Sequence, residues 1–548
     1  MTRLLCQAVY VRPDRVGDLR AWWRKTRGKG GAPGKLRRST RRPVYLEGSD
    51  DCPPLGEPMG QWVIDHVLHG PPMAVPSYGF DLVPVGAHSL RARRRRWTRQ
   101  ACVLLAVAWV SYLASWAAAV WAAALIAALL MRWSASRAAR KKDEGKRPSR
   151  LARSPRLAYT ALGVPWLLAL LPSGPLSGDG LPALRLRLVL LPFVALLAAA
   201  VVFAGDRLAA RTALAALVRD GVSADRLPWT GPRAGRRLSD IGRHQTWQAL
   251  PYDTAEHFIG AGRDAWWPAH INIRLKPKDP ENSVRHFGEM ELLDRVGTAL
   301  DELGRGAREI TQPLPGFSME RVVGLPADMW LHRTRQAKRE LPDLRGLGRK
   351  SPSSVPDRLY LRAQCITWDG QVVVSVFVHA ALEAGELRLT VRPHVMTPLY
   401  NELRVTAAPA NKRRMRLAGW LATQSLLDAA AGPTALWQRT ARTGKPSEGR
   451  AEEKDPVSLR DRYSTEEVTD MHQSDDAKRH VVLMQSCVFR AVADYLRQQG
   501  VDTTAYEQQV AVVINNILVY GDNNAPIQNV AGTGISGVGQ DQTNHGGQ

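Results

Sequence analysis

Clusters of arginine and lysine flank an uncharged stretch of this sequence. Their type and spacing indicate a site that binds anions. Six arginines lie within nine residues, and two adjacent lysines follow in a second basic segment: Arg91, Arg93, Arg94, Arg95, Arg96, Arg99, Lys141 and Lys142. Guanidinium and ammonium groups bind phosphate oxygens through charge-assisted hydrogen bonds. We therefore predict that these eight residues bind a membrane surface rich in anionic phospholipid.

The distribution of charge along the chain favours lipid over nucleic acid as the anionic partner. The formal net charge is +24; residues 1–99 carry 19 Lys and Arg against 8 Asp and Glu, and residues 132–156 carry 10 against 2. Both basic stretches adjoin hydrophobic segments, as the positive-inside rule requires. Nucleic-acid binding by the basic, tryptophan-containing residues 20–42 remains an alternative, but we expect it to be the less favoured one.

Recognisable catalytic and metal-binding motifs do not occur in the sequence. The histidines form no HExxH group, the five cysteines form no CxxC pair, and no GxSxG or kinase motif occurs. The run Gly260 to Ala265 fits GxGxxA, but Trp266, Trp267 and Pro268 prevent the helix that a dinucleotide loop needs. We expect no enzyme activity, cofactor or metal. The alternative is a membrane-anchored enzyme whose unrecognised site lies in the Trp-rich residues 247–274.

Three hydrophobic segments follow the first arginine cluster and predict how these cations are positioned. Ala101–Met131 is uncharged over 31 residues, Leu157–Leu176 is apolar, and Leu188–Gly205 adds 18 more uncharged residues. The first segment is long for one crossing and short for two, so it is either a helical hairpin or one long helix. We predict a multi-pass α-helical membrane region over residues 100–206, in the cell (inner) membrane of a bacterium.

The remainder of the chain predicts a cytoplasmic α+β domain. Residues 359–368, 372–379 and 387–393 read as strands of an antiparallel β-meander, with Asp369-Gly370 as a hairpin turn. The boundaries that we expect are a basic, loosely structured region over 1–99, the membrane region over 100–206, a soluble α+β domain over 225–440, a charged linker over 441–463, a helical section over 464–520 and a Gly/Asn/Gln-rich tail over 521–548.

The tail is the second stretch that suggests a function. Asn and Gln side chains form ladders in stacked strands, and Ile527, Gln528, Val530 and Ile535 are the residues that we expect in such an assembly. The run Pro526-Ile527-Gln528, with the preceding Gly-Asp-Asn-Asn and the later Ile535-Ser536-Gly537, resembles the amyloid signalling motifs of bacterial proteins, which are similar to the RIP homotypic interaction motif. The resemblance covers about 20 of 548 residues, and Asn529 departs from the animal pattern.

The resemblance implies a tail that templates assembly with a partner that carries a like motif. The alternative is a disordered tail, since its composition builds no hydrophobic core. Taken together, the sequence predicts an integral bacterial inner-membrane protein with a cytoplasmic sensing or protein-interaction domain. Its expected partners are anionic phospholipid and a protein partner or further copies of the chain.

Overall fold

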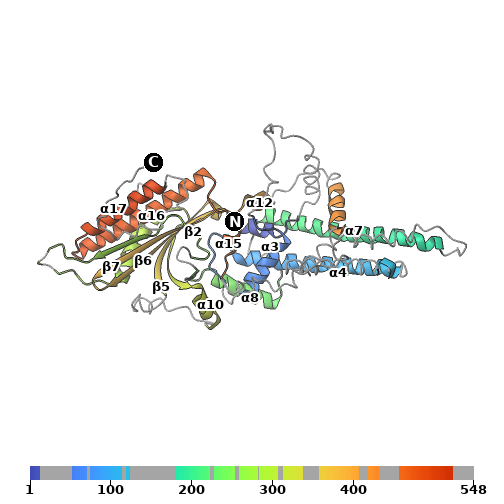
Figure 1. The fold of residues 1–548 in the computed structure, drawn as a ribbon, viewed down its shortest axis with the longest axis horizontal. Coiled ribbons are helices and arrows are strands. Elements are labelled where there is room, and N and C mark those ends of the chain that lie inside the picture. The colour runs from blue at the N-terminus through green and yellow to red at the C-terminus, as the bar shows by residue number, and fades with distance from the viewer. Residues whose placement is uncertain are drawn as a thin grey trace, which may run out of the picture.

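The structure of the protein is a computed structural model, in which a curled sheet covered by helices continues into a projecting pair of long helices (Figure 1). The ranges that it describes are residues 1–12, 52–70, 74–113, 119–121, 123, 181–222, 227–253, 258–279, 281, 283–306, 313–336, 357–405, 418–430 and 456–521.

One seven-stranded sheet runs in the order β1-β4-β5-β6-β7-β2, and β3 pairs with β7 beside β2. The strands are β1 (Ala249–Tyr252), β2 (Arg263–Asp264), β3 (Ala269–Arg274), β4 (Ser318–Pro326), β5 (Arg358–Thr367), β6 (Val372–Glu383) and β7 (Glu386–Met396). All neighbours are antiparallel except β1 and β4, which are parallel.

The three expected strands of the meander form β5, β6 and β7, which pair in sequence order. The turn between β5 and β6 is the short helix η6 (Trp368–Gly370), in which Asp369 has φ 53° and Gly370 has φ 82°. These left-handed conformations suit Gly, and Asp tolerates them better than most residues. The Asp-Gly pair therefore reverses the chain as its sequence indicates.

Helices α9 (Glu289–Arg305) and α16 (Met471–Gln498) cover one face of the sheet, and Figure 1 shows α16 lying across it. The β-branched side chains of β6 that point to this face pack against Val481, Met484 and Val488 of α16. Asp470 precedes α16 as its N-cap, and its side chain accepts a hydrogen bond from the Gln473 amide at 3.0 Å. Helix α17 (Thr504–Gly521) follows and contributes Tyr506 to the same core.

A second core joins N-terminal helices to helices of the C-terminal half. Its helices are α1 (Thr2–Ala8), α3 (Glu57–Trp62), η2 (Val63–Leu68), the first turns of α4 (Leu82–Leu113), the last turns of α7 (Leu181–Asp220), α8 (Pro232–His244), α12 (Asn401–Val405) and α15 (Leu459–Tyr463). A further helix, α10 (Ala327–Gln336), packs beside β1 and β4. Residues 1–99, expected to be loosely structured, thus contain several packed helices.

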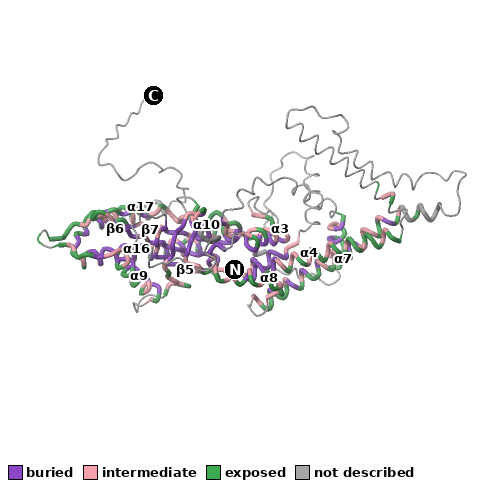
Figure 2. The backbone as a smooth tube through the Cα atoms, turned by 90° about the horizontal axis from the view of Figure 1, so that it is seen from below, coloured by how far each residue is buried: buried purple, intermediate pink, exposed green. Residues whose placement is uncertain are grey.

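The projecting pair consists of α4 and α7 (Leu181–Asp220), which run antiparallel (Figures 1 and 2). Val103 of α4 packs near Ala199 and Ala200 of α7, whereas Arg99, one turn earlier, reaches Asp206. Most side chains on the outer half of this pair are exposed or half-buried, in contrast to the buried interior of the sheet (Figure 2).

The predicted fold class, a multi-pass membrane region with an antiparallel α+β domain, is wrong. Among the described residues one helix, over Val189–Asp220, is long and apolar enough to cross a membrane. The start of the apolar run 101–131 is the outer part of α4, which begins at Leu82 and carries all six arginines, so it is not a separate spanning helix. The rest of that run is described only in part, and Leu157–Leu176 lies outside the described residues.

The sheet also differs from the prediction because it is mixed. Strand β1 pairs in parallel with β4, from Ala249 with Val323 to Tyr252 with Pro326. Parallel pairing requires a long connection, and here it includes β2, β3 and α9. The local sequence carries no signal for such a distant partner.

Candidate functional site

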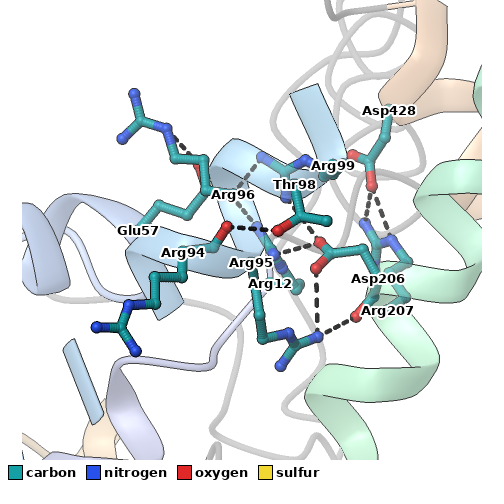
Figure 3. Close-up of polar contacts among 10 residues, drawn as sticks. All are labelled: Arg12, Glu57, Arg94, Arg95, Arg96, Thr98, Arg99, Asp206, Arg207 and Asp428. Carbon is teal, nitrogen blue, oxygen red and sulfur yellow. Dashed lines mark hydrogen bonds and ion pairs between the residues drawn. The ribbon is translucent and has the colours of Figure 1, made fainter. Parts of the chain in front are cut away.

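The candidate site is a cluster of arginines and carboxylates at the base of the projecting pair (Figure 3). Arg95, Arg96 and Arg99 of α4 lie on one face of the helix, because residues three and four positions apart are neighbours on a helix surface. Helix α7 brings Asp206 alongside them, α3 brings Glu57, and Arg12 follows α1. We call this set the arginine–carboxylate cluster; it consists of Arg12, Glu57, Arg95, Arg96, Arg99 and Asp206.

Asp206 accepts hydrogen bonds from three arginines. Arg99 Nη1 lies 2.7 Å from Asp206 Oδ2, and Arg95 Nη2 lies 3.2 Å from Oδ1 and 2.5 Å from the Asp206 carbonyl oxygen. Arg12 donates to the same carboxylate. The Asp206 and Arg99 side chains are only 7% and 9% exposed, so this ion pair is shielded from water. It fastens α7 to α4 at the level where both helices become apolar.

Glu57 is the second carboxylate of the cluster. Arg99 Nη2 donates to Glu57 Oε1 at 2.6 Å, Arg12 also donates to it, and Arg96 Nε lies 3.9 Å from Oε2. Burial by itself would raise the pKa of Glu57, but Arg12 and Arg99 outweigh it and lower the pKa from 4.5 to about 2. Four guanidinium groups thus face two carboxylates, and the cluster keeps a surplus of positive charge.

Arg94 points away from the cluster toward the loop before α8. Its two terminal nitrogens donate to the carbonyl oxygens of Trp229 and Thr230, each at 2.6 Å, and its guanidinium lies 4.5 Å from the Trp229 ring centre. The Trp229 side chain is 77% exposed, and Trp97 on α4 is 64% exposed. Exposed tryptophans beside arginines are typical of a membrane–water interface.

Arg207 forms a separate buried pair with the helix over residues 418–430 (Figure 3). Its Nε donates to Asp428 Oδ2 at 2.7 Å, its Nη2 lies 3.4 Å from Gln424 Oε1, and the Trp420 ring lies 5.7 Å from its guanidinium. Ala429 packs against Ala199 and Ala200 on the same side of α7. A segment of the C-terminal half thus docks on the apolar helix.

The predicted lipid-binding residues divide into two groups in the structure. Arg95, Arg96 and Arg99 are held in the arginine–carboxylate cluster, whereas Arg91 and Arg94 are exposed and Arg93 is half-buried. Predicted residues outside the described part of the chain are Lys141, Lys142, Ile527, Gln528, Val530 and Ile535.

Sequence reasoning missed the acidic members of the cluster. Asp206 directly follows the uncharged run Leu188–Gly205, and an acid at the end of an apolar run opposite an arginine-rich helix was a usable signal. Glu57 and Arg12 carry no such signal, because they reach the cluster only through tertiary packing.

A buried polar row crosses the sheet and was also not predicted. Gln364 Nε2 donates to Ser375 Oγ at 3.0 Å, Ser375 lies opposite His394 in register, and His394 Nε2 lies 3.3 Å from Asp264 Oδ1. Ser, His and Asp are the residue types of a hydrolytic triad. Ser375 and His394 are fully buried, however, so a substrate cannot reach the hydroxyl in this conformation. We interpret the row as a structural network of the sheet.

Metal-ligand grouping is likewise not seen in the described ranges, which contain no set of three His, Cys, Asp or Glu side chains that could hold an ion. The glycines of the GxGxxA run, Gly260 and Gly262, have φ 87° and 91° and lead into β2 rather than into a helix. This geometry is that of a turn in the sheet and not of a dinucleotide loop.

Comparison with known proteins identifies one part of the chain. Residues 267–532 match the AbeC-like domain. No curated protein and no solved structure matches the chain. The AbeC-like region begins just before β3 and includes α9, β4 to β7, the helix over 418–430, α16 and α17. It excludes α4, α7, β1 and β2, so the sheet of the AbeC-like region is completed by strands from outside the match.

Proposed function

We propose that this protein is a bacterial inner-membrane protein of the interaction or sensing kind. Helix α7 lies in the bilayer, and the AbeC-like region recognises a protein partner or further copies of the chain in the cytoplasm. The AbeC-like family is of the bacterial amyloid-signalling type, which supports a bacterial source and a role in protein interaction.

The exposed apolar surface of α7 is the observation that carries this proposal. Between Arg187 and Asp206 the helix has 18 uncharged residues, which span about 27 Å and approach the roughly 30 Å of a bilayer core. Only 17% of its most apolar window is buried by the rest of the protein. Its exposed side chains form one stripe, which consists of Leu186, Leu190, Phe193, Val194, Leu197 and Val201. A core helix of a water-soluble protein would bury such a stripe.

The arginine–carboxylate cluster lies at the end of this stripe, where lipid headgroups would begin. Its surplus positive charge, together with the exposed Arg91 and Arg94, attracts anionic phosphate at about 1 kcal/mol per cation near the surface. Trp97 and Trp229 lie at the same level, which supports an interfacial position.

A matched pair of valine substitutions tests the membrane proposal. Val201, 66% exposed, lies within the stripe, and Val218, 41% exposed, lies on the same helix beyond the cluster. We expect the wild-type chain to sediment with bacterial membranes, to resist high salt and to be released by detergent. Val201→Glu should move part of the chain to the soluble fraction because it places an unpaired charge within the apolar stripe, whereas Val218→Glu should not. A wild-type chain that fractionates as soluble protein contradicts the proposal.

We also propose that residues 521–540 template assembly between copies of the chain. The resemblance of this tail to amyloid signalling motifs and the AbeC-like match, which covers its first half, support this role. Backbone pairing between stacked strands supplies the affinity, and Ile527, Gln528, Val530 and Ile535 supply the side-chain interface.

A further inference from the structure

Strand β3 lies at the edge of the sheet, and a side chain of α17 occupies the pairing groups of that edge. The Asn272 amide donates to Gln509 Oε1 at 3.1 Å, and Gln509 Nε2 donates to the Asn272 carbonyl oxygen at 2.9 Å. The primary amide of Gln509 therefore makes the same two hydrogen bonds that a residue of a neighbouring antiparallel strand would make.

The contact shows which backbone groups of β3 point outward. Asn272 directs both its N–H and its C=O to Gln509. Backbone groups of every second residue point to the same side of a strand, so the N–H and C=O groups of His270 and Arg274 also point away from β7. An edge strand of this kind is a template for a further strand unless something covers it. Helix α17 is the cover, with Gln509 as its direct contact to the edge.

The described side chains of α17, from Thr504 to Asn515, are mostly exposed or half-buried. From Thr504 to Asn515 only Tyr506 is fully buried, with its hydroxyl donating to the Phe489 carbonyl oxygen at 3.1 Å, while Val510, Val513 and Ile514 are half-buried. A helix with so little buried apolar surface opens at low free-energy cost. The cover can therefore leave the edge without unfolding the sheet.

We propose that the β3 edge is a strand-addition site, that α17 closes it through Gln509, and that its occupant is the tail of a second copy of this chain. Release of α17 opens the edge on one copy, and residues 522–548 of the other copy, which follow α17 directly in sequence, supply the added strand.

Charge complementarity favours the tail as the occupant. The exposed side chains of β3 are His270, Asn272 and Arg274, and none of them is acidic. Residues 522–548 contain Asp522 and Asp541 and no Lys or Arg. A second β3 strand, the other self-complementary partner, would instead bring Arg274 opposite His270 when the two strands pair about Asn272. A second β3 strand offers no carboxylate to Arg274, whereas the tail does.

Adjacent glutamines on α17 provide a matched test in the full-length protein. Gln509→Ala removes both hydrogen bonds to Asn272, and Gln508→Ala makes the same change at an exposed neighbouring position. Neither change weakens the helix, since Ala has the higher helix propensity. We expect Gln509→Ala to speed amide hydrogen exchange over β3 by about tenfold or more, since each of the two lost hydrogen bonds contributes about 1 kcal/mol, and to shift detergent-purified protein to larger species in analytical ultracentrifugation. Gln508→Ala should change neither.

Deletion of residues 522–548 in the Gln509→Ala background identifies the occupant. The proposal expects fast exchange over β3 to persist while the larger species disappear. Larger species that survive the deletion mean that another strand, such as β3 of a second copy, fills the edge, and this overturns the assignment to the tail. Fast exchange without larger species, or unchanged exchange in Gln509→Ala, overturns the strand-addition site itself.

This inference rests on the proposed assembly role of the tail, and a peptide of residues 516–540 separates the two. If the peptide forms cross-β fibres with a repeat of about 4.7 Å while Gln509→Ala has no effect, the tail proposal stands and the β3 site fails. If the peptide stays soluble while Gln509→Ala associates through the tail, fibre formation fails and strand addition at β3 stands.

Discussion

At the scale of single residues, the main polar feature of this protein is a set of arginines that form ion pairs with buried carboxylates. Arg12, Arg95 and Arg99 share two carboxylates at the point where α4 and α7 become apolar. A buried carboxylate in such a setting remains charged only because the cations outweigh its desolvation. The contribution of the Glu57 carboxylate to the free energy of unfolding must therefore depend on pH.

Replacement of Glu57 by Gln tests this dependence. The pKa of Glu57 in the folded protein, about 2, lies below its ordinary value of 4.5. The charged pair therefore contributes to stability above pH 4.5, and the contribution is lost as the pH falls toward 2. At pH 7 we expect Glu57→Gln to lower the free energy of unfolding by about 3 kcal/mol, and the difference from wild type should shrink as the pH falls to 3.

Denaturant unfolding in detergent at pH 7 and pH 3 provides the measurement. Glu466→Gln is the control, because the Glu466 side chain is 75% exposed and lies 3.5 Å from Arg263, which is 66% exposed. Its effect should stay below about 1 kcal/mol at both pH values. A Glu57→Gln difference that is constant with pH would contradict the ion-pair interpretation.

At the scale of elements, the helix over residues 418–430 is the most informative contact between the two halves of the chain. It belongs to the AbeC-like region but packs on α7 through Arg207, Asp428 and Ala429. Arg207 is only 4% exposed, so loss of its carboxylate would leave a buried charge poorly compensated. The attachment of this helix should depend on Asp428.

Asp428→Asn should release the helix over 418–430 from α7. We expect amide exchange of residues 418–430 to rise at least tenfold, since breaking a buried pair costs about 3 kcal/mol, while exchange in β5 to β7 is unchanged. Thr423→Ala is the control, because the Thr423 side chain is exposed and bonds only within its own helix, to Gly419. Equal exchange in Asp428→Asn and wild type would show that apolar packing alone holds the helix.

The sequence predicts local elements of this fold better than their partners. The β5–β6–β7 meander follows from alternation and the Asp-Gly turn, because neighbouring strands pair with those next in sequence. The β1–β4 pairing and the meeting of Arg12 with Asp206 join residues 74 and 194 positions apart, for which local pattern carries no information. The prediction of a multi-pass membrane region was wrong for a related reason. Hydropathy identifies an apolar run, but it does not show that residues from 101 onward continue the helix that begins at Leu82.

At the scale of the whole molecule, one arginine joins the sheet to the N-terminal helices. Arg460 is fully buried and donates to the carbonyl oxygens of Tyr78, Gly370, Gln371 and Thr397 at 2.6 to 3.2 Å. Burial lowers its pKa to about 9, so it remains protonated at neutral pH. Four carbonyls from three segments thus depend on a single cation.

Arg460→Met should uncouple the two parts of the molecule. The change leaves buried carbonyl oxygens without donors, which we expect to cost about 3 kcal/mol or more, and a single thermal unfolding transition in calorimetry should become two. Arg462→Met is the matched control, because Arg462 is exposed and its ring contact with Trp62, at 5.1 Å, contributes about 1 kcal/mol or less. A single transition in Arg460→Met would show that the apolar contacts of the second core suffice.

The parallel strand β1 has a practical consequence for anyone who isolates the AbeC-like region of this chain. A fragment cut at residue 267 lacks Ala249–Tyr252, and the outer side of β4 then loses its neighbour. A bare strand of this kind recruits strands from other molecules. Aggregation of such a fragment would result from the loss of β1 and would not show that the full-length protein assembles. Expression should therefore begin upstream of Trp247.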